Sequence, residues 1–227
     1  MIKDLTKQYD EIGVAYLEGQ KKFYNGKIDA PRKFILNNLK FNETTSLLDV
    51  GCGNGDDILL YRNRGVKIVC GVDSSKVMVQ EAKRKLLDTS GDIALVNIED
   101  AAYQDNAFNA VVARYSLQNL ANLDKAYENI ARILNPNGQF VFTVPHPIRD
   151  FALSKEKRYG KQEIVQISLY NRSVVVNLPT HTLKDYLSDI FCEKFTLETI
   201  HEEVRESDED AHIEGMPEFL GISARKR

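Results

Sequence analysis

The chain of 227 residues has a formal net charge of −3, with 43% hydrophobic and 28% charged residues. This composition is typical of one soluble α/β domain and gives no basic footprint for nucleic acid, and no apolar run approaches the roughly 20 residues of a membrane span. The three cysteines lack paired spacing, which argues against a zinc site or a disulfide scaffold. We therefore expect one cytoplasmic domain over residues 1–227, with no nucleic-acid, membrane or metal partner.

The N-terminal segment is expected to be helical. Apolar residues between Leu5 and Leu17 fall on one helix face, and Pro31 can open a second helix that runs to Leu39. We expect residues 1–45 to form a lid over a ligand site.

The segment at residues 47–55, LLDVGCGNG, is the most informative part of the chain. A short apolar run that ends in Asp49 and alternating glycines predicts a buried strand, a tight turn and a nucleoside-type ligand against bare backbone. A dinucleotide fingerprint needs a glycine where Asp56 stands. The two carboxylates, Asp49 and Asp56, would repel a diphosphate and attract an ammonium and a sulfonium, the charges of S-adenosylmethionine.

This segment resembles the class I S-adenosylmethionine-dependent methyltransferases of the small-molecule type, and the resemblance covers about residues 9–144. In that family the glycine loop contacts the methionine half of the cofactor, and an acid after the second strand, here residues 67–73, binds the ribose hydroxyls. Asp73 follows the loop at about the expected 20 residues. The resemblance thus implies cofactor contacts from Asp49, Gly51, Cys52, Gly53, Asp73, Ser74 and Met78.

Residues 97–109 resemble the family stretch in which an aspartate and the next backbone amide read the adenine edge. Asn97 replaces the usual aspartate, and its amide oxygen can still accept the adenine amino group, without a charge. The resemblance also assigns cofactor contacts to Ile98, Glu99 and Arg114, the last at the end of a strand over residues 110–113. Tyr16 resembles a lid tyrosine that closes on the methionine half, or it packs as an ordinary helix residue.

The remaining elements complete a doubly wound, seven-stranded, mostly parallel Rossmann-like sheet. A cofactor-binding core over residues 46–144 ends in a strand at 139–144, and a substrate-side insertion follows at 145–180. In it, residues 146–162 are expected to be a loop, and residues 163–169 and 173–178 an inserted hairpin or an extended flap. Residues 181–227 should then supply a helix capped by Thr182, spanning about 180–191, and antiparallel strands at 195–204 and 218–224.

The sequence marks the residues that would bind the methyl acceptor less clearly than those that would bind the cofactor. His146, between two prolines directly after the fifth strand, is the best candidate for a catalytic base, with a hydrogen-bonded turn histidine as the alternative. Arg114, Tyr115, Arg149, Tyr170 and His181 are further candidates to face the acceptor. An acidic stretch over residues 202–210 is either a solvated turn or a rim that attracts a cation.

We therefore expect a methyltransferase that uses S-adenosylmethionine to methylate a small molecule, as a monomer or a homodimer. Two alternatives stay open. One is a protein that binds S-adenosylmethionine or S-adenosylhomocysteine for regulation, or as a partner subunit, without methyl transfer. The other, disfavoured by Asp56, is a dinucleotide-dependent oxidoreductase.

Overall fold

A seven-stranded sheet forms the centre of the computed structural model, which describes all residues except 1–4, 6, 25–26, 88–92, 171 and 205–214. The strand order is β3-β2-β1-β4-β5-β9-β8. The first five strands in this order are parallel, and β9 alone runs in the opposite direction, between β5 and β8. The strands are β1 (Ser46–Val50), β2 (Ile68–Asp73), β3 (Ile93–Leu95), β4 (Phe108–Arg114), β5 (Leu134–Pro145), β8 (Phe195–Val204) and β9 (Pro217–Lys226). The predicted doubly wound, mostly parallel sheet is confirmed.

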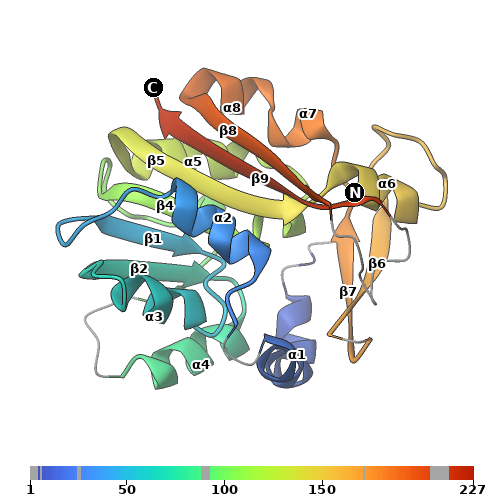
Figure 1. Ribbon diagram of the computed structural model, residues 1–227, viewed down its shortest axis with the longest axis horizontal. Coiled ribbons are helices and arrows are strands. Elements are labelled where there is room, and N and C mark those ends of the chain that lie inside the picture. The colour runs from blue at the N-terminus through green and yellow to red at the C-terminus, as the bar shows by residue number, and fades with distance from the viewer. Residues whose placement is uncertain (1–4, 6, 25–26, 88–92, 171, 205–214) are drawn as a thin grey trace.

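Helices cover both faces of this sheet, so its central strands are buried on both sides (Figure 1). One layer contains α2 (Ala30–Asn38), α3 (Asp56–Arg62) and α4 (Lys76–Lys85). The opposite layer contains α5 (Asp124–Ile133) and α8 (Asp189–Lys194), whose aromatic rings pack on β5. The short helix α7 (Leu183–Tyr186) precedes α8.

A cover lies beyond the carboxyl ends of the parallel strands, where α1 (Gln8–Tyr24) runs beside the hairpin of β6 (Ile164–Leu169) and β7 (Val174–Pro179) (Figure 1). The Gln8 side chain bonds both backbone groups of Asn177, at 2.9 and 2.8 Å. Gly19 lets α1 approach the hairpin, because a Cβ there would lie 2.7 Å from the Tyr170 ring. The N-terminal helix and the inserted hairpin therefore form one unit.

Two local predictions are wrong. Residues 147–153, expected in a loop, form α6 (Pro147–Leu153), because His146 caps the helix and Pro147 occupies its first turn. The single helix expected at 180–191 is instead α7 and α8, since Ser188 caps a new helix. Thr182 caps α7 as predicted, through a reciprocal bond with Asp185.

The second N-terminal helix packs mainly on the core of the sheet. Phe34 and Ile35 of α2 are buried in the core beneath it, against β5 and β9. Of the two N-terminal helices, α1 is the one that lies over the strand ends.

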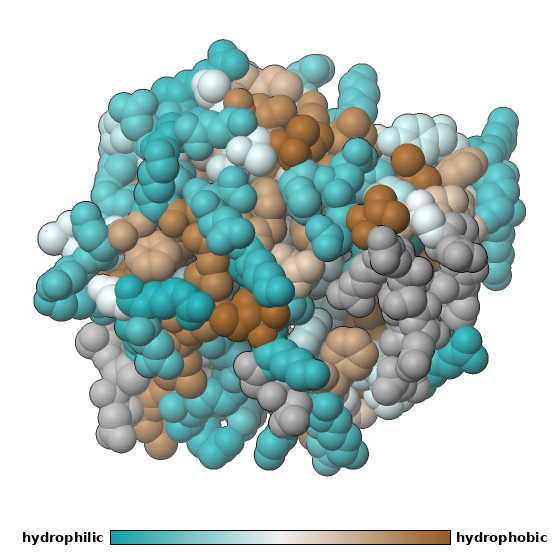
Figure 2. Space-filling model, in the orientation of Figure 1, coloured by the Kyte–Doolittle hydropathy of each residue, from teal (hydrophilic) through white to brown (hydrophobic). Residues whose placement is uncertain are grey.

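The surface in Figure 2 is mostly hydrophilic, with separate apolar patches between charged groups. Within the described ranges, no helix has the length and apolar character to cross a bilayer.

Candidate functional site

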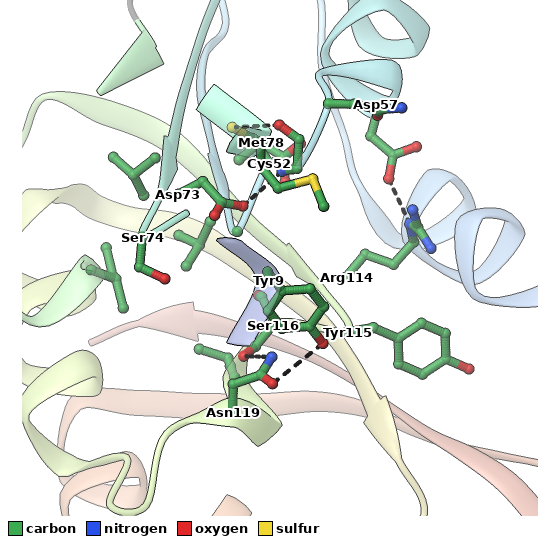
Figure 3. A pocket seen from close by; sticks show the side chains of 18 of the residues that line it. Tyr9, Cys52, Asp57, Asp73, Ser74, Met78, Arg114, Tyr115, Ser116 and Asn119 are labelled. Atoms are coloured by element: carbon green, nitrogen blue, oxygen red, sulfur yellow. Dashed lines mark hydrogen bonds and ion pairs between the residues drawn. The ribbon is translucent and has the colours of Figure 1, made fainter. Parts of the chain in front are cut away.

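A cavity of about 970 Å³, its open mouth included, lies at the carboxyl ends of β1, β2 and β4 beneath α1 (Figure 3). We call it the first cavity. Glu99 is the one predicted cofactor residue that does not line it, and its side chain instead accepts a hydrogen bond from Asn97 Nδ2 at 3.1 Å. The structure brings together at this cavity the predicted residues Tyr16, Asp49, Gly51, Cys52, Gly53, Asp73, Ser74, Met78, Asn97, Ile98 and Arg114.

The glycine loop follows β1 and turns through left-handed backbone. Gly51 and Gly53 have φ of +68° and +52°, which other residues adopt at a cost. A Cβ on Gly51 would lie 2.3 Å from the Ser116 side chain, whereas a Cβ on Gly53 would meet nothing within 4 Å. Gly51 is thus required by packing within the protein, and Gly53 leaves the cavity wall as bare backbone.

Asp73, at the end of β2, ties the loop to the next helix. Its Oδ2 accepts from the Gly53 amide at 2.9 Å and its Oδ1 from the Ser75 amide at 2.8 Å. Each oxygen keeps a second lone pair for a further donor. Asp73 therefore offers two fixed acceptors at the cavity wall, the arrangement that a ribose diol requires.

Asp49 is the most unusual polar group of the cavity. It is 3% exposed, and its Oδ2 has no hydrogen-bond partner among the described residues. Burial, with the nearby Asp57 carboxylate adding to it, raises the pKa of Asp49 well above its usual value. An unpartnered buried acceptor is costly, so a cationic group in the cavity would be bound favourably here.

Arg114, predicted to reach the cofactor, also belongs to a buried charge network. Its Nε and the Nε of Arg32 lie 2.5 Å from the two oxygens of Asp57, and its Nη1 lies 3.8 Å from Asp29. Burial opposes ionisation of Asp57, but the two guanidinium groups outweigh it and hold the pKa of Asp57 below its usual value. The network joins α2, α3 and β4, and no spacing in the sequence signals it.

A second cavity of about 880 Å³, its mouth included, adjoins the first, and Tyr9, Tyr16, Arg114 and Tyr115 line both. Most of its aromatic wall comes from α1 and the hairpin. The Tyr16 ring lies edge-on to Tyr9 and to Tyr170, with centroids 5.3 Å apart in each pair. Tyr115 holds a left-handed φ of +50° at the junction of the cavities, a strained backbone of the kind found at functional sites.

Comparison with known proteins agrees with this geometry. Residues 48–142 match the family model of a methyltransferase domain. Over these residues the chain is similar to the class I S-adenosylmethionine-dependent methyltransferase family. S-adenosylmethionine is accordingly its cofactor.

Relatives of this chain include proteins named as methyltransferases. The chain is 27% identical, over 143 residues, to a demethylmenaquinone methyltransferase from Symbiobacterium thermophilum, a match that covers 60% of this chain and 54% of the relative. The chain spans about half the length of the curated relatives it matches.

Solved structures share the fold at low identity. An S-adenosylmethionine-dependent methyltransferase from Mesorhizobium loti superposes with a TM-score of 0.69 at 21% identity, over 86% of this chain and 96% of that chain. The cyclase SpnF superposes with a TM-score of 0.71 at 17% identity, over 100% and 97% of the two chains. Because a cyclase is also similar to this chain in fold, the fold alone does not fix the reaction.

The residues of the first cavity fit the cofactor of a methyltransferase. The unpartnered Asp49 oxygen suits the ammonium of the methionine half, and the two Asp73 oxygens suit the ribose hydroxyls. Gly53 leaves room because no Cβ occupies the wall. The buried Met78 side chain offers a soft apolar surface for a base.

His146 lines neither of the two cavities. Its Nδ1 accepts from the Ile148 amide at 3.2 Å, and its Nε2 lies 2.7 Å from Glu202 Oε1. Because Nδ1 accepts, Nε2 carries the hydrogen that Glu202 receives, so no lone pair of the ring is free to take a proton. This geometry is that of a helix cap, and the catalytic role of His146 stays a prediction.

The other acceptor-side candidates divide into two groups. Arg149 and Tyr170 line the second cavity with Tyr115, whereas His181 is buried behind it, with Nε2 3.3 Å from the Gln118 carbonyl oxygen. Of the acidic stretch, residues 205–210 lie outside the described residues. Gln118 lines the second cavity and Asn119 lines the first. Neither residue was predicted from the sequence, because the short turn after β4 has no distinctive pattern.

Proposed function

We propose that this protein transfers the methyl group of S-adenosylmethionine to a small molecule held in the second cavity. One observation carries the proposal: two cavities of similar size meet at a shared wall formed by Tyr9, Tyr16, Arg114 and Tyr115. One cavity has the polar groups for the cofactor, and the other has an aromatic lining. A methyl group could pass between them without leaving the protein.

Bound S-adenosylmethionine would supply a methyl carbon made electrophilic by its sulfonium. Asp49, Gly53 and Asp73 would hold S-adenosylmethionine, and its methyl group would pass to the acceptor atom while the electron pair of the broken carbon–sulfur bond stays with sulfur and the acceptor proton leaves to solvent. The protein contributes mainly alignment of the two reactants. The α1 helix and the hairpin contribute by excluding water from the junction.

The names of the relatives suggest which acceptors to try first. Several are named as methyltransferases of menaquinone or ubiquinone biosynthesis. An aromatic-lined cavity is compatible with a ring-bearing acceptor. A reduced quinone analogue therefore belongs in the first acceptor panel.

Two measurements test the proposal. Calorimetric titration should show binding of S-adenosylhomocysteine and none of NAD. Incubation with methyl-labelled S-adenosylmethionine and a panel of acceptors should then transfer the label. Cofactor binding with no transfer to any acceptor would favour the alternative of a binding protein, and binding of NAD alone would contradict the proposal altogether.

A further inference from the structure

Gln118 lies in the short turn η2 (Leu117–Asn119) directly after β4, and lines the second cavity. It is 4% exposed, and its Nε2 donates to the Tyr115 carbonyl oxygen at 2.7 Å. Its Oε1 has no hydrogen-bond partner within the part of the chain that the structure describes. Because the Tyr115 carbonyl can only accept, the amide orientation is fixed and the unsatisfied atom is the oxygen.

The turn that carries Gln118 is held on both sides. The carbonyl oxygen of Gln118 lies 3.3 Å from Nε2 of His181. Burial lowers the pKa of His181, so its ring is neutral at pH 7 and can donate from Nε2. On the other side Asn119 donates to the Ser116 carbonyl at 3.0 Å and accepts from Tyr9 at 3.4 Å (Figure 3). Gln118 is thus pre-organised at the wall of the second cavity.

The second cavity has no net formal charge at neutral pH. Its charged lining residues are two acids, Asp29 and Glu218, and two bases, Arg114 and Arg149. Asp29 and Arg114 already belong to the buried network around Asp57. A charged acceptor would add an uncompensated charge to a mostly enclosed space, which is costly.

Aromatic rings dominate the remaining wall. Phe23 and Tyr24 of α1 lie 5.7 and 6.1 Å, between centroids, from the Tyr170 ring of the hairpin. Ring faces and edges in such an arrangement favour a planar aromatic ligand. The unpartnered oxygen of Gln118 favours a ligand that carries a hydrogen-bond donor.

We propose that Gln118 is an acceptor-binding residue whose Oε1 accepts a hydrogen bond from the hydroxyl or N–H group of an uncharged aromatic acceptor in the second cavity. This inference rests on the proposed function and specifies its substrate class. One hydrogen bond fixes the donor-bearing edge of the ring, and the aromatic walls hold the ring plane. The acceptor atom is thereby presented to the junction at Tyr115.

Four naphthalene probes test the substrate class, each titrated into the protein saturated with S-adenosylhomocysteine. They are 2-naphthol, its methyl ether 2-methoxynaphthalene, the anion 6-hydroxy-2-naphthoate and the cation 2-naphthylmethylammonium. We expect 2-naphthol to bind most tightly and the ether about tenfold more weakly, the loss of one neutral hydrogen bond. Tighter binding of either ion, equal binding of 2-naphthol and its ether, or binding of no probe overturns the inference.

A Gln118→Met variant tests the residue, because methionine keeps the length of the side chain and lacks the amide. We expect binding of 2-naphthol to weaken about tenfold, while the dissociation constants of the ether and of S-adenosylhomocysteine stay unchanged. Gln166→Met, on the exposed side of β6, is the matched control and should change none of the three.

Equal losses for 2-naphthol and its ether in Gln118→Met would make Gln118 a packing residue and overturn the assignment. If this variant does not fold, the comparison of the two probes in the wild-type protein decides. A wild-type protein that fails to bind S-adenosylhomocysteine contradicts the proposed function instead, so the two failures are distinguishable.

Discussion

Buried carboxylates of the same residue type differ in pKa because their neighbours differ. Asp57 accepts from two guanidinium groups and stays ionised, whereas Asp49 has an unpartnered oxygen and a raised pKa. Asp73 is held between two backbone amides. The environment of Asp57 suits a structural anchor, that of Asp49 a site for a cation, and that of Asp73 a pair of acceptors for a diol.

Asp73→Ala should weaken binding of S-adenosylhomocysteine by about 1.5 to 3 kcal/mol, because a charged acceptor of the ribose hydroxyls is removed. Titration calorimetry measures the change. Asp100→Ala, at an exposed position of the neighbouring turn, is the control and should bind as the wild type does. An unchanged dissociation constant in folded Asp73→Ala would refute the ribose assignment.

Asp150 makes stability depend on pH. It is 1% exposed, neither of its carboxylate oxygens has a partner among the described residues, and burial raises its pKa to about 7. Between its usual pKa of about 4 and this value, the folded state binds the proton more tightly than the unfolded state, so stability falls as pH rises through this window. Asp150→Asn should remove this fall.

Urea denaturation at a series of pH values checks the prediction. At pH 8, Asp150→Asn should be more stable than the wild type by about 1 to 4 kcal/mol, and the two should converge toward pH 4. Asp100→Asn serves as the exposed control. Parallel curves for Asp150→Asn and the wild type would mean that Asp150 does not cause the dependence.

At the scale of elements, helix starts and tight turns depend on single residues with specific backbone roles. His146 caps α6, Ser188 caps α8, and Gly51 allows the turn after β1 to pass close to Ser116. Substitution at such positions acts first on an element and only then on the site.

The cap of α6 separates a structural from a catalytic role for His146. His146→Ala should lower the free energy of unfolding by about 1 kcal/mol, whereas His146→Asn, which restores a capping side chain, should lower it less. Turnover of folded protein should stay near that of the wild type in both variants. A loss of about 10²-fold in His146→Asn, with cofactor affinity unchanged, would instead support the catalytic base.

A substitution in the glycine loop has a matched control at a glycine after α3. Gly51→Ala adds a Cβ 2.3 Å from Ser116, while Gly65→Ala, also at positive φ, meets nothing within 4 Å. Gly65→Ala should cost about 1 kcal/mol of stability from backbone strain alone, and Gly51→Ala should cost more. Ser116→Gly should recover part of the loss in the double variant. Equal costs for the two alanines would show that the approach to Ser116 does not constrain the loop.

At the scale of the whole molecule, the first cavity lies between parts of the chain that are far apart in sequence. Its wall includes α1, the loop after β1, the end of β2 and the turn after β4. Side-chain bonds tie α1 to this core, with Asp10 accepting from Ser75 at 2.7 Å and Tyr9 donating to Asn119. A ligand bound there would contact most of these parts at once, so its binding should stabilise the whole fold.

S-adenosylhomocysteine at about 100 times its dissociation constant should therefore add about 2.7 kcal/mol to the free energy of unfolding. For a chain of this size that is an increase of about 5 to 10 °C in Tm, measured by thermal denaturation. NAD at the same concentration is the control and should give no shift. A Tm that does not respond to S-adenosylhomocysteine would contradict binding in the folded state.

The sequence by itself determined the fold class and most of the residues that line the first cavity. Apolar strands, glycine turns and the acid at the end of β2 are local patterns, and parallel topology places the strand ends at one edge, so Asp49, Gly53 and Asp73 could be predicted together. The hairpin of β6 and β7 could be predicted from its alternating apolar residues, but its contact with α1 could not.

Only the tertiary structure shows the surroundings of Arg114, His146 and Gln118. The partners of Arg114 and His146, Asp57 and Glu202, are 57 and 56 residues away in the chain, and such distant pairs leave no periodic signal. Gln118 became a candidate only because it lines a cavity formed largely by distant segments and its side-chain oxygen has no partner among the described residues. Local pattern fixes where the backbone turns, but the satisfaction of a buried polar group depends on which distant groups the fold brings to it.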